Sequence, residues 1–226
     1  MLLPKGQRFR SDFPRFGLPQ FADRLPTSVA EPLLQLSLND VHALRVDLSS
    51  TSLPRVTVTA DFHCVTTWSY PQVTWRGVGF RSLYTLYCAH YRSRSTTMLP
   101  PIRGAVIHGR DGCRTTLSLK DLLSDDVLIA DTLGEQPLSV EHGAPLRLIA
   151  PAHYGYKNIK YVTKISFYTK MPVVKTGLLW LLDHPRARVS KEERGRLLPQ
   201  LALRYAYRHL IASTVKRFND AVVKDK

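Results

Sequence analysis

Cys64 is the residue of this chain whose chemistry is easiest to name. It lies in the stretch FHCVTTWSYPQVTWRGV, where polar and aromatic side chains occupy positions that a core strand would fill with aliphatic ones. A thiolate is a soft ligand that suits a soft or high-valent metal. One cysteine cannot hold zinc or an iron–sulfur cluster alone, so a metal site here implies a cofactor that brings the other ligands. A buried core thiol is the alternative.

A second polar segment, EHGAPLRLIAPAHYGYKNIKYV, carries basic residues around a turn. Arg147, Lys157 and Lys160 flank the turn that contains Gly155. Such a turn can direct backbone N–H groups and side-chain cations toward one phosphate. The alternative is a solvated basic loop.

Several common function classes have no motif in the sequence. The eight histidines form no HExxH pair, and no Walker A, GxSxG or GxGxxG pattern occurs. The three cysteines lack CxxC spacing, which argues against a disulfide framework and a thiolate zinc site and favours a reducing compartment. No signal peptide is recognisable, and the apolar run GLLWLLD is too short to span a bilayer, so we expect a cytoplasmic protein.

The charge of the chain calls for an anionic partner. Its net charge is +14, and residues 171–226 hold 12 Lys and Arg against 5 Asp and Glu. Nucleic acid, an acidic membrane surface, an acidic protein and a phosphorylated cofactor all satisfy this requirement. A hydrophobic content of 44% is sufficient for a substantial core.

Hydrophobic patterning predicts an α+β protein. The alternation in RVTVTADF predicts a strand that leads directly into Cys64, and Leu83, Leu86 and Tyr87 have helical spacing. We expect strands at 55–62, 103–108, 127–133, 147–151 and 161–169, and helices at 80–91 and 118–123.

The two ends of the chain differ from this strand-rich core. Residues 1–35 predict an ordered arm or a disordered tail, and the aromatic content favours the arm. Ser190 and Glu193 have the spacing of a capping box, which predicts a basic helical segment from Ser190 with an interruption at Pro199. We therefore expect a domain over 1–170 and a basic helical C-terminal extension over 171–226.

Four blocks in a fixed order carry a family resemblance. HCVTTWS, TWRGV, HGAPLRLIAP and GYKNIKYV resemble the molybdopterin-binding domain of the sulfite-oxidase family over residues 13–167. The chain is most similar to small haem-free bacterial members, which include a methionine-sulfoxide reductase catalytic subunit. The resemblance implies the mixed-strand core of that family, a molybdenum–molybdopterin (pyranopterin) cofactor, and two-electron oxygen-atom transfer on a small sulfur- or nitrogen-containing substrate.

The same resemblance assigns residues. It makes Cys64 the molybdenum ligand and gives Arg147 and Lys160 to the cofactor phosphate. The other cofactor-binding candidates are Arg15, Phe16, His63, Thr66, His108, His142, Lys157, Asn158 and Ile159. Because the resemblance includes no haem domain, we expect electrons to be exchanged with a separate protein.

Two positions depart from the family pattern. His142 stands where many bacterial members have asparagine, and Asp131 stands where animal sulfite oxidases have a catalytic tyrosine. A carboxylate at that place should repel sulfite. Asp131, His153 and Tyr154 are the candidates for moving a proton in the substrate pocket, and ordinary structural hydrogen bonding is their alternative.

Two further functions stay open. Arg204, Tyr205, Tyr207 and Arg208 interleave cations with aromatics, a pattern also found in nucleic-acid-binding proteins, although we consider this partner unlikely. The chain could instead carry the cofactor without catalysis. The basic C-terminus can also pack its apolar side (Leu201, Tyr205, Ile211) on the domain, or contact an acidic membrane or protein.

Overall fold

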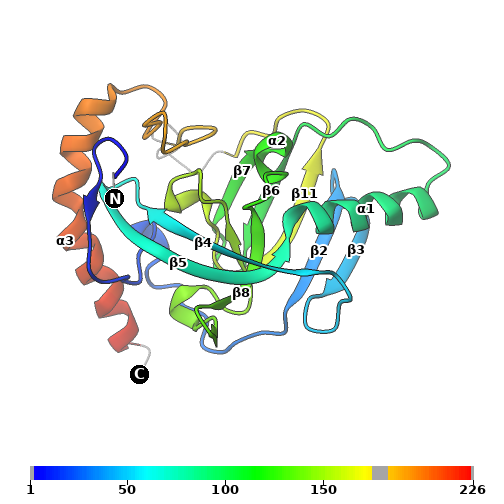
Figure 1. The fold of residues 1–226 in the computed structure, drawn as a ribbon, viewed down its shortest axis with the longest axis horizontal. Helices are drawn as coiled ribbons and strands as arrows, with labels where there is room; N and C mark the ends of the chain where they lie inside the picture. Colours follow the sequence, from blue (N-terminus) through cyan, green and yellow to red (C-terminus); the bar gives the residue numbers. More distant parts are fainter. Residues whose placement is uncertain (1–2, 175–182, 225–226) are drawn as a thin grey trace.

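The computed structural model describes residues 3–174 and 183–224, which form two β-sheets and three α-helices (Figure 1). The six-stranded sheet has the order β1 (Arg8–Phe9), β5 (Trp68–Gly79), β8 (Leu128–Leu133), β10 (Arg147–Ile149), with β4 (Arg55–His63) paired to β5 and β9 (Gln136–Pro137) paired to β8. The five-stranded sheet has the order β3 (Val41–Asp47), β2 (Leu33–Leu38), β11 (Val162–Tyr168), β6 (Gly104–Gly109), β7 (Arg114–Ser118).

The main core joins the two sheets to helix α1 (Phe80–Arg94). Leu36 and Ile165 from one sheet pack in the same buried cluster as Ile129 from the other and Leu83 and Tyr87 from α1. The helical spacing seen in the sequence therefore marks the buried face of α1. Short α2 (Leu119–Leu122) begins with the side chain of Ser118 accepting a hydrogen bond from the backbone N–H of Asp121 at 3.1 Å.

The predicted α+β class and mixed-strand core are confirmed. The strands expected at 55–62, 103–108, 127–133 and 161–169 correspond to β4, β6, β8 and β11, and β10 is shorter than the predicted 147–151. β4 and β5 form an antiparallel hairpin whose turn contains Cys64. Gly77 of β5 lies so close to β8 that an added Cβ would overlap the carbonyl oxygen of Ile129.

Helix α3 (Gln200–Lys224) begins ten residues later than the Ser190 start that the capping box predicted. Glu193 does not cap a helix, because its carboxylate accepts a hydrogen bond from the backbone N–H of Arg188 at 2.9 Å and pairs with the Arg188 guanidinium. Glu192 has a φ of 54°, a value incompatible with a right-handed helix at this residue. This local ion pair therefore overrides the sequence signal.

The face of α3 that packs on the protein also differs from the expected one. Leu201 and Tyr205 are each 69% exposed, whereas Leu203, Thr214, Phe218 and other residues of the opposite face are buried. Figure 1 shows α3 beside the N-terminal arm, at the end of the molecule away from α1. Phe218 packs with Ala22 of the arm, so the two ends of the chain meet. Within the described residues, no helix is long and apolar enough to cross a membrane.

Candidate cofactor site

A cavity of about 550 Å³ lies beside the β4–β5 turn, and widely separated parts of the chain line it. The N-terminal arm, the turn itself, the β6–β7 connection, the loop before β11 and the C-terminal region all contribute walls. The lining includes Arg15, Phe16, Phe62, Cys64, Thr66, Asp111, Thr115, Arg147, Asn158, Ile159, Lys160, Asp183, Arg194, Tyr207 and Phe218. The predicted arm and the predicted C-terminal extension therefore share one cavity with the strand core.

Cys64 is held rigidly at the wall of this cavity. Its backbone N–H donates to the carbonyl of Trp68 at 2.8 Å, and the N–H of Thr67 donates to the Cys64 carbonyl at 3.2 Å. Its Sγ lies 3.0 Å from Oγ1 of Thr66. Burial raises the pKa of the thiol to about 11, so the free side chain is a neutral thiol at pH 7. A thiolate here needs a positive partner such as a metal ion.

His63, next to the cysteine, is used to hold the N-terminal arm. Its Nδ1 lies 2.7 Å from Oγ of Ser69, and that hydroxyl donates to Oε1 of Gln7 at 3.1 Å. Gln7 in turn donates from Nε2 to the carbonyl of Cys64 at 3.1 Å. Burial lowers the pKa of His63 and favours its neutral form. His63 therefore supports the cysteine turn and does not line the cavity.

Arg147 and Lys160 bring positive charge into the cavity wall, and neither has an ion-pair partner among the described residues. Arg147 is 2% exposed, donates from Nη1 to the His142 carbonyl at 3.0 Å, and lies over the rings of Phe62 and Trp75. Its Nε has no hydrogen-bond partner among the described residues. Burial lowers the pKa of Arg147 to about 10. A buried cation with an unused donor is suited to bind an anion.

Lys160 has the same unfavourable environment. Its Nζ donates to the Glu141 carbonyl at 2.7 Å. Burial, followed by the positive charges of Arg147 and Arg15, holds the pKa of Lys160 well below its usual value, against the opposing effect of the Asp111 and Glu141 carboxylates. A phosphate in the cavity would relieve this repulsion.

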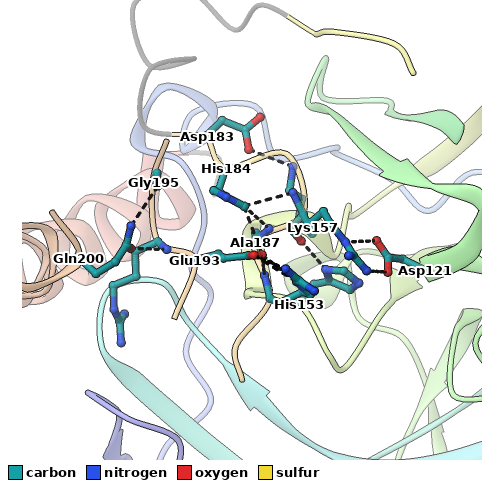
Figure 2. Close-up of polar contacts among 12 residues, drawn as sticks. Asp121, His153, Lys157, Asp183, His184, Ala187, Glu193, Gly195 and Gln200 are labelled. Carbon is teal, nitrogen blue, oxygen red and sulfur yellow. Dashed lines mark hydrogen bonds and ion pairs between the residues drawn. The ribbon is translucent and has the colours of Figure 1, made fainter. Parts of the chain in front are cut away.

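The other residues of the GYKNIKYV block have structural partners. Asn158 accepts a hydrogen bond from the Ala150 N–H at 2.7 Å, although the residue also lines the cavity. The fully buried Lys157 pairs with Asp183 at 2.9 Å, as Figure 2 shows. Lys157 thus has a carboxylate as its ion-pair partner, whereas Arg147 and Lys160 have none among the described residues.

Arg15 and Phe16 close the arm side of the cavity. Arg15 is buried and donates to the carbonyls of Phe218 at 3.1 Å and Ala22 at 2.7 Å. Phe16 stacks on Phe218 with ring centroids 6.3 Å apart and meets the Trp68 ring edge-on. The arm is ordered, and it is fastened to α3.

His142 and His108 were also predicted to bind the cofactor but, like His63 and Lys157, lie outside the lining of this cavity. His142 stacks on Phe13 with a centroid distance of 5.0 Å, and burial, with the charges of Arg147 and Lys160, lowers its pKa to about 4. Nε2 of His108 lies 3.4 Å from Oγ of Ser166.

The three residues predicted for proton transfer are not brought together at the cavity wall. Asp131 forms an ion pair with Arg55. Nδ1 of His153 forms a hydrogen bond with the Arg186 carbonyl. Tyr154 is fully buried, with the Arg194 guanidinium 5.1 Å from its ring centre.

Sequence reasoning missed the contribution of the β6–β7 connection. Asp111 of this connection and Thr115 of β7 line the cavity, and Oγ1 of Thr115 is buried without a partner among the described residues. Burial raises the pKa of Asp111. The Asp-Gly pair at 111–112 is a turn signal, and Gly112 has a φ of 87°. That signal locates a turn, but it could not show that the turn faces Cys64.

Comparison with known proteins identifies the family to which the chain belongs. Residues 34–173 match the family model described as the oxidoreductase molybdopterin-binding domain. This chain belongs to that family. The resemblance inferred from the sequence blocks is therefore confirmed.

Individual relatives agree with the family assignment. The chain is 32% identical over 139 residues to the uncharacterized oxidoreductase YuiH of Bacillus subtilis, covering 62% of this chain and 61% of that protein. It is 31% identical over 115 residues to the protein-methionine-sulfoxide reductase catalytic subunit MsrP of Xanthomonas campestris, covering 48% and 35%. The chain thus spans less than two thirds of the length of either relative.

A solved structure shares the fold. The sulfane dehydrogenase SoxCD from Paracoccus pantotrophus superposes with a TM-score of 0.56 at 18% identity, covering 71% of this chain and 45% of that one. At this identity the likeness concerns the fold alone.

Proposed function

We propose that this chain is a molybdenum–pyranopterin oxidoreductase in which Cys64 supplies the protein thiolate to the metal. The observation that carries the proposal is the cavity that places Cys64 in one lining with Arg147 and Lys160, two cations whose pKa burial lowers. A soft sulfur donor and an anion-binding cluster are the two features that a metal held by a phosphorylated organic ligand requires. The residues present therefore fit the cofactor.

Each wall of the cavity has a role in this proposal. Arg147 and Lys160, with Arg15 nearby, bind the phosphate, and the free hydroxyl of Thr115 offers a hydrogen bond to the pterin. Phe16 covers the arm side and excludes water. The bound cofactor supplies two-electron redox chemistry with oxygen-atom exchange at molybdenum.

The protein controls protons around this chemistry. Cys64 releases its thiol proton when it binds the metal, because only the thiolate is a ligand. Asp111 is an ionisable group of the cavity wall whose pKa burial raises, so it can hold a proton there. We propose a small sulfur- or nitrogen-containing substrate and electron exchange with a separate protein. The name of the relative MsrP describes, for that protein, a catalytic subunit that reduces methionine sulfoxide in proteins, which is a sulfur-centred substrate.

Two readouts test the proposal together. Protein made in a host that synthesises the cofactor should contain near one molybdenum per chain by metal analysis, and denaturation should release a fluorescent oxidised pterin. Cys64→Ser should lose the thiolate-to-metal absorption and turnover. Cys88→Ser is the matched control, because Cys88 lies on α1 and outside the cavity lining. Wild-type protein with neither metal nor pterin would refute the proposal, whereas full loading without turnover of an S-oxide, an N-oxide or sulfite would indicate a carrier.

The structure does not keep together the four residues that suggested nucleic-acid binding. Arg204 forms an ion pair with Glu192, and Tyr207 lines the cavity. Of the four residues that interleave cations with aromatics, Tyr205 and Arg208 remain exposed. Two exposed residues on one helix do not make a stacking platform with a basic track.

A further inference from the structure

A buried arginine from the C-terminal region reaches the cysteine turn. Arg194 is fully buried, lines the cavity and lies outside the residues that match the family model. Its Nη1 donates to the Val65 carbonyl at 2.5 Å, and its Nη2 donates to the carbonyls of Gly6 at 3.2 Å and Lys5 at 3.4 Å. One guanidinium thus joins the C-terminal region, the N-terminal arm and the residue next to Cys64.

The turn depends on such contacts because its backbone conformation is unfavourable. Thr67 has a φ of 77°, a region that β-branched residues avoid. Three carbonyls of the turn accept hydrogen bonds from residues outside it. The Cys64 carbonyl accepts from the Gln7 side chain, and the Val65 carbonyl accepts from Arg194. The Thr67 carbonyl accepts from the backbone N–H of Arg8 at 2.9 Å. Arg194 is the contact among these that comes from the C-terminal region.

Arg194 is itself held in place before any ligand binds. Its backbone N–H donates to Oε1 of Gln200 at 2.8 Å, and its Nε lies 3.3 Å from Oε1 of Glu192. The same carboxylate oxygen accepts from Nε of Arg204 on α3 at 2.8 Å. Gly6 permits the close approach, because a Cβ there would overlap Arg204 and lie 2.9 Å from Nη2 of Arg194. The guanidinium therefore cannot turn away from the loop without breaking a buried network.

We propose that Arg194 is a positioning residue for the metal-binding cysteine: it fixes the Cys64–Thr67 turn so that the sulfur meets the cofactor in one geometry. The effect on the cofactor rests on the proposed function, because it requires Cys64 to bind the metal. The hydrogen bond from Arg194 to the turn is observed independently of that function. Arg194 acts through the backbone of Val65 and needs no contact with the substrate.

The test compares Arg194→Gln and Arg194→Lys with Arg188→Gln. Arg188 belongs to the same segment and is ion-paired with Glu193. Among the described residues its side chain makes no hydrogen bond or ion pair with the cysteine turn, so it controls for general loosening of the segment. In full-length protein, hydrogen exchange of the 64–68 amides should accelerate roughly tenfold to a hundredfold in Arg194→Gln, the effect of losing a hydrogen bond to a charged donor. Arg194→Lys keeps the charge but cannot reach all three carbonyls, so its exchange rate should lie between those of the wild type and Arg194→Gln.

A spectroscopic readout separates positioning from simple stabilisation. In metal-loaded protein, the thiolate-to-molybdenum absorption should shift in Arg194→Gln and stay unchanged in Arg188→Gln. Unchanged exchange and absorption in Arg194→Gln would overturn the inference, as would equal changes in Arg188→Gln. If Arg194→Gln does not fold, Arg194→Lys decides, and wild-type behaviour of that variant in both measurements overturns the inference. Failure of the proposed function is a distinct result, because wild-type protein then lacks molybdenum while the exchange comparison still reports on Arg194.

Discussion

Replacing Lys160 with methionine should have opposite effects on the cofactor-free and cofactor-loaded protein. In the free protein, burial and the charges of Arg147 and Arg15 lower the pKa of Lys160 well below its usual value. Each unit by which a folded pKa falls costs the charged form about 1.4 kcal/mol. The substitution removes this cost and loses one hydrogen bond to the Glu141 carbonyl, worth about 1 kcal/mol. The free energy of unfolding should therefore increase.

With the cofactor bound, the same charge becomes favourable. A charged hydrogen bond to phosphate contributes roughly 1.5 to 3 kcal/mol, so Lys160→Met should release the cofactor about 10 to 100 times more readily. Denaturant unfolding of cofactor-free protein and pterin retention after dialysis measure the two effects. Lys164→Met is the control, because Lys164 lies on β11, pairs with Asp40 and does not line the cavity. A variant that is less stable when free, or that retains the cofactor as the wild type does, would refute the assignment of Lys160 to an anion site.

Two further predictions concern the fold around the site. Gly77→Ala should destabilise the protein by about 3 kcal/mol or more, since the new Cβ overlaps the Ile129 carbonyl of the neighbouring strand. Denaturant unfolding measures this loss. A loss below about 1 kcal/mol would mean that β5 and β8 can separate at little cost in free energy. His142→Gln should flatten the acid dependence of stability: the folded pKa of His142, about 4, lies below its unfolded value of 6.5, so the wild type loses up to about 3 kcal/mol as pH falls from 6.5 to 4. Parallel pH–stability curves for the two proteins would contradict that burial.

Local patterns predicted the strand core well because each of them is decided by neighbouring residues. The alternation of β4 depends on Val56, Val58 and their partners across the hairpin, and it correctly placed Cys64 at the exit of a strand. The role of a polar residue depends instead on partners that are distant in sequence. Asp131 pairs with Arg55 across strands, a contact that no spacing in the sequence could reveal.

In the C-terminal region, too, contacts that the sequence pattern could not reveal determine the structure. Ser190 and Glu193 have the spacing of a helix start, yet Glu193 pairs with Arg188 and the helix begins at Gln200. The irregular segment that results is fastened to the core through Arg186, whose Nε donates to Asp121 at 3.0 Å, and through the Lys157–Asp183 pair (Figure 2). These contacts bring Arg194 to the cysteine turn.

The closure of the cavity by both chain ends has a physical consequence for cofactor binding. The family match ends at residue 173, but Arg194 and Tyr207 beyond it line the cavity with Arg15 and Phe16 before it. Arg15 donates to the carbonyl of Phe218, so the arm and α3 stabilise each other at the cavity wall. If Arg147 and Lys160 bind a phosphate as proposed, the anion offsets buried positive charge and favours the conformation in which this wall is formed. The stability of the two chain ends and the occupancy of the cavity should therefore be coupled.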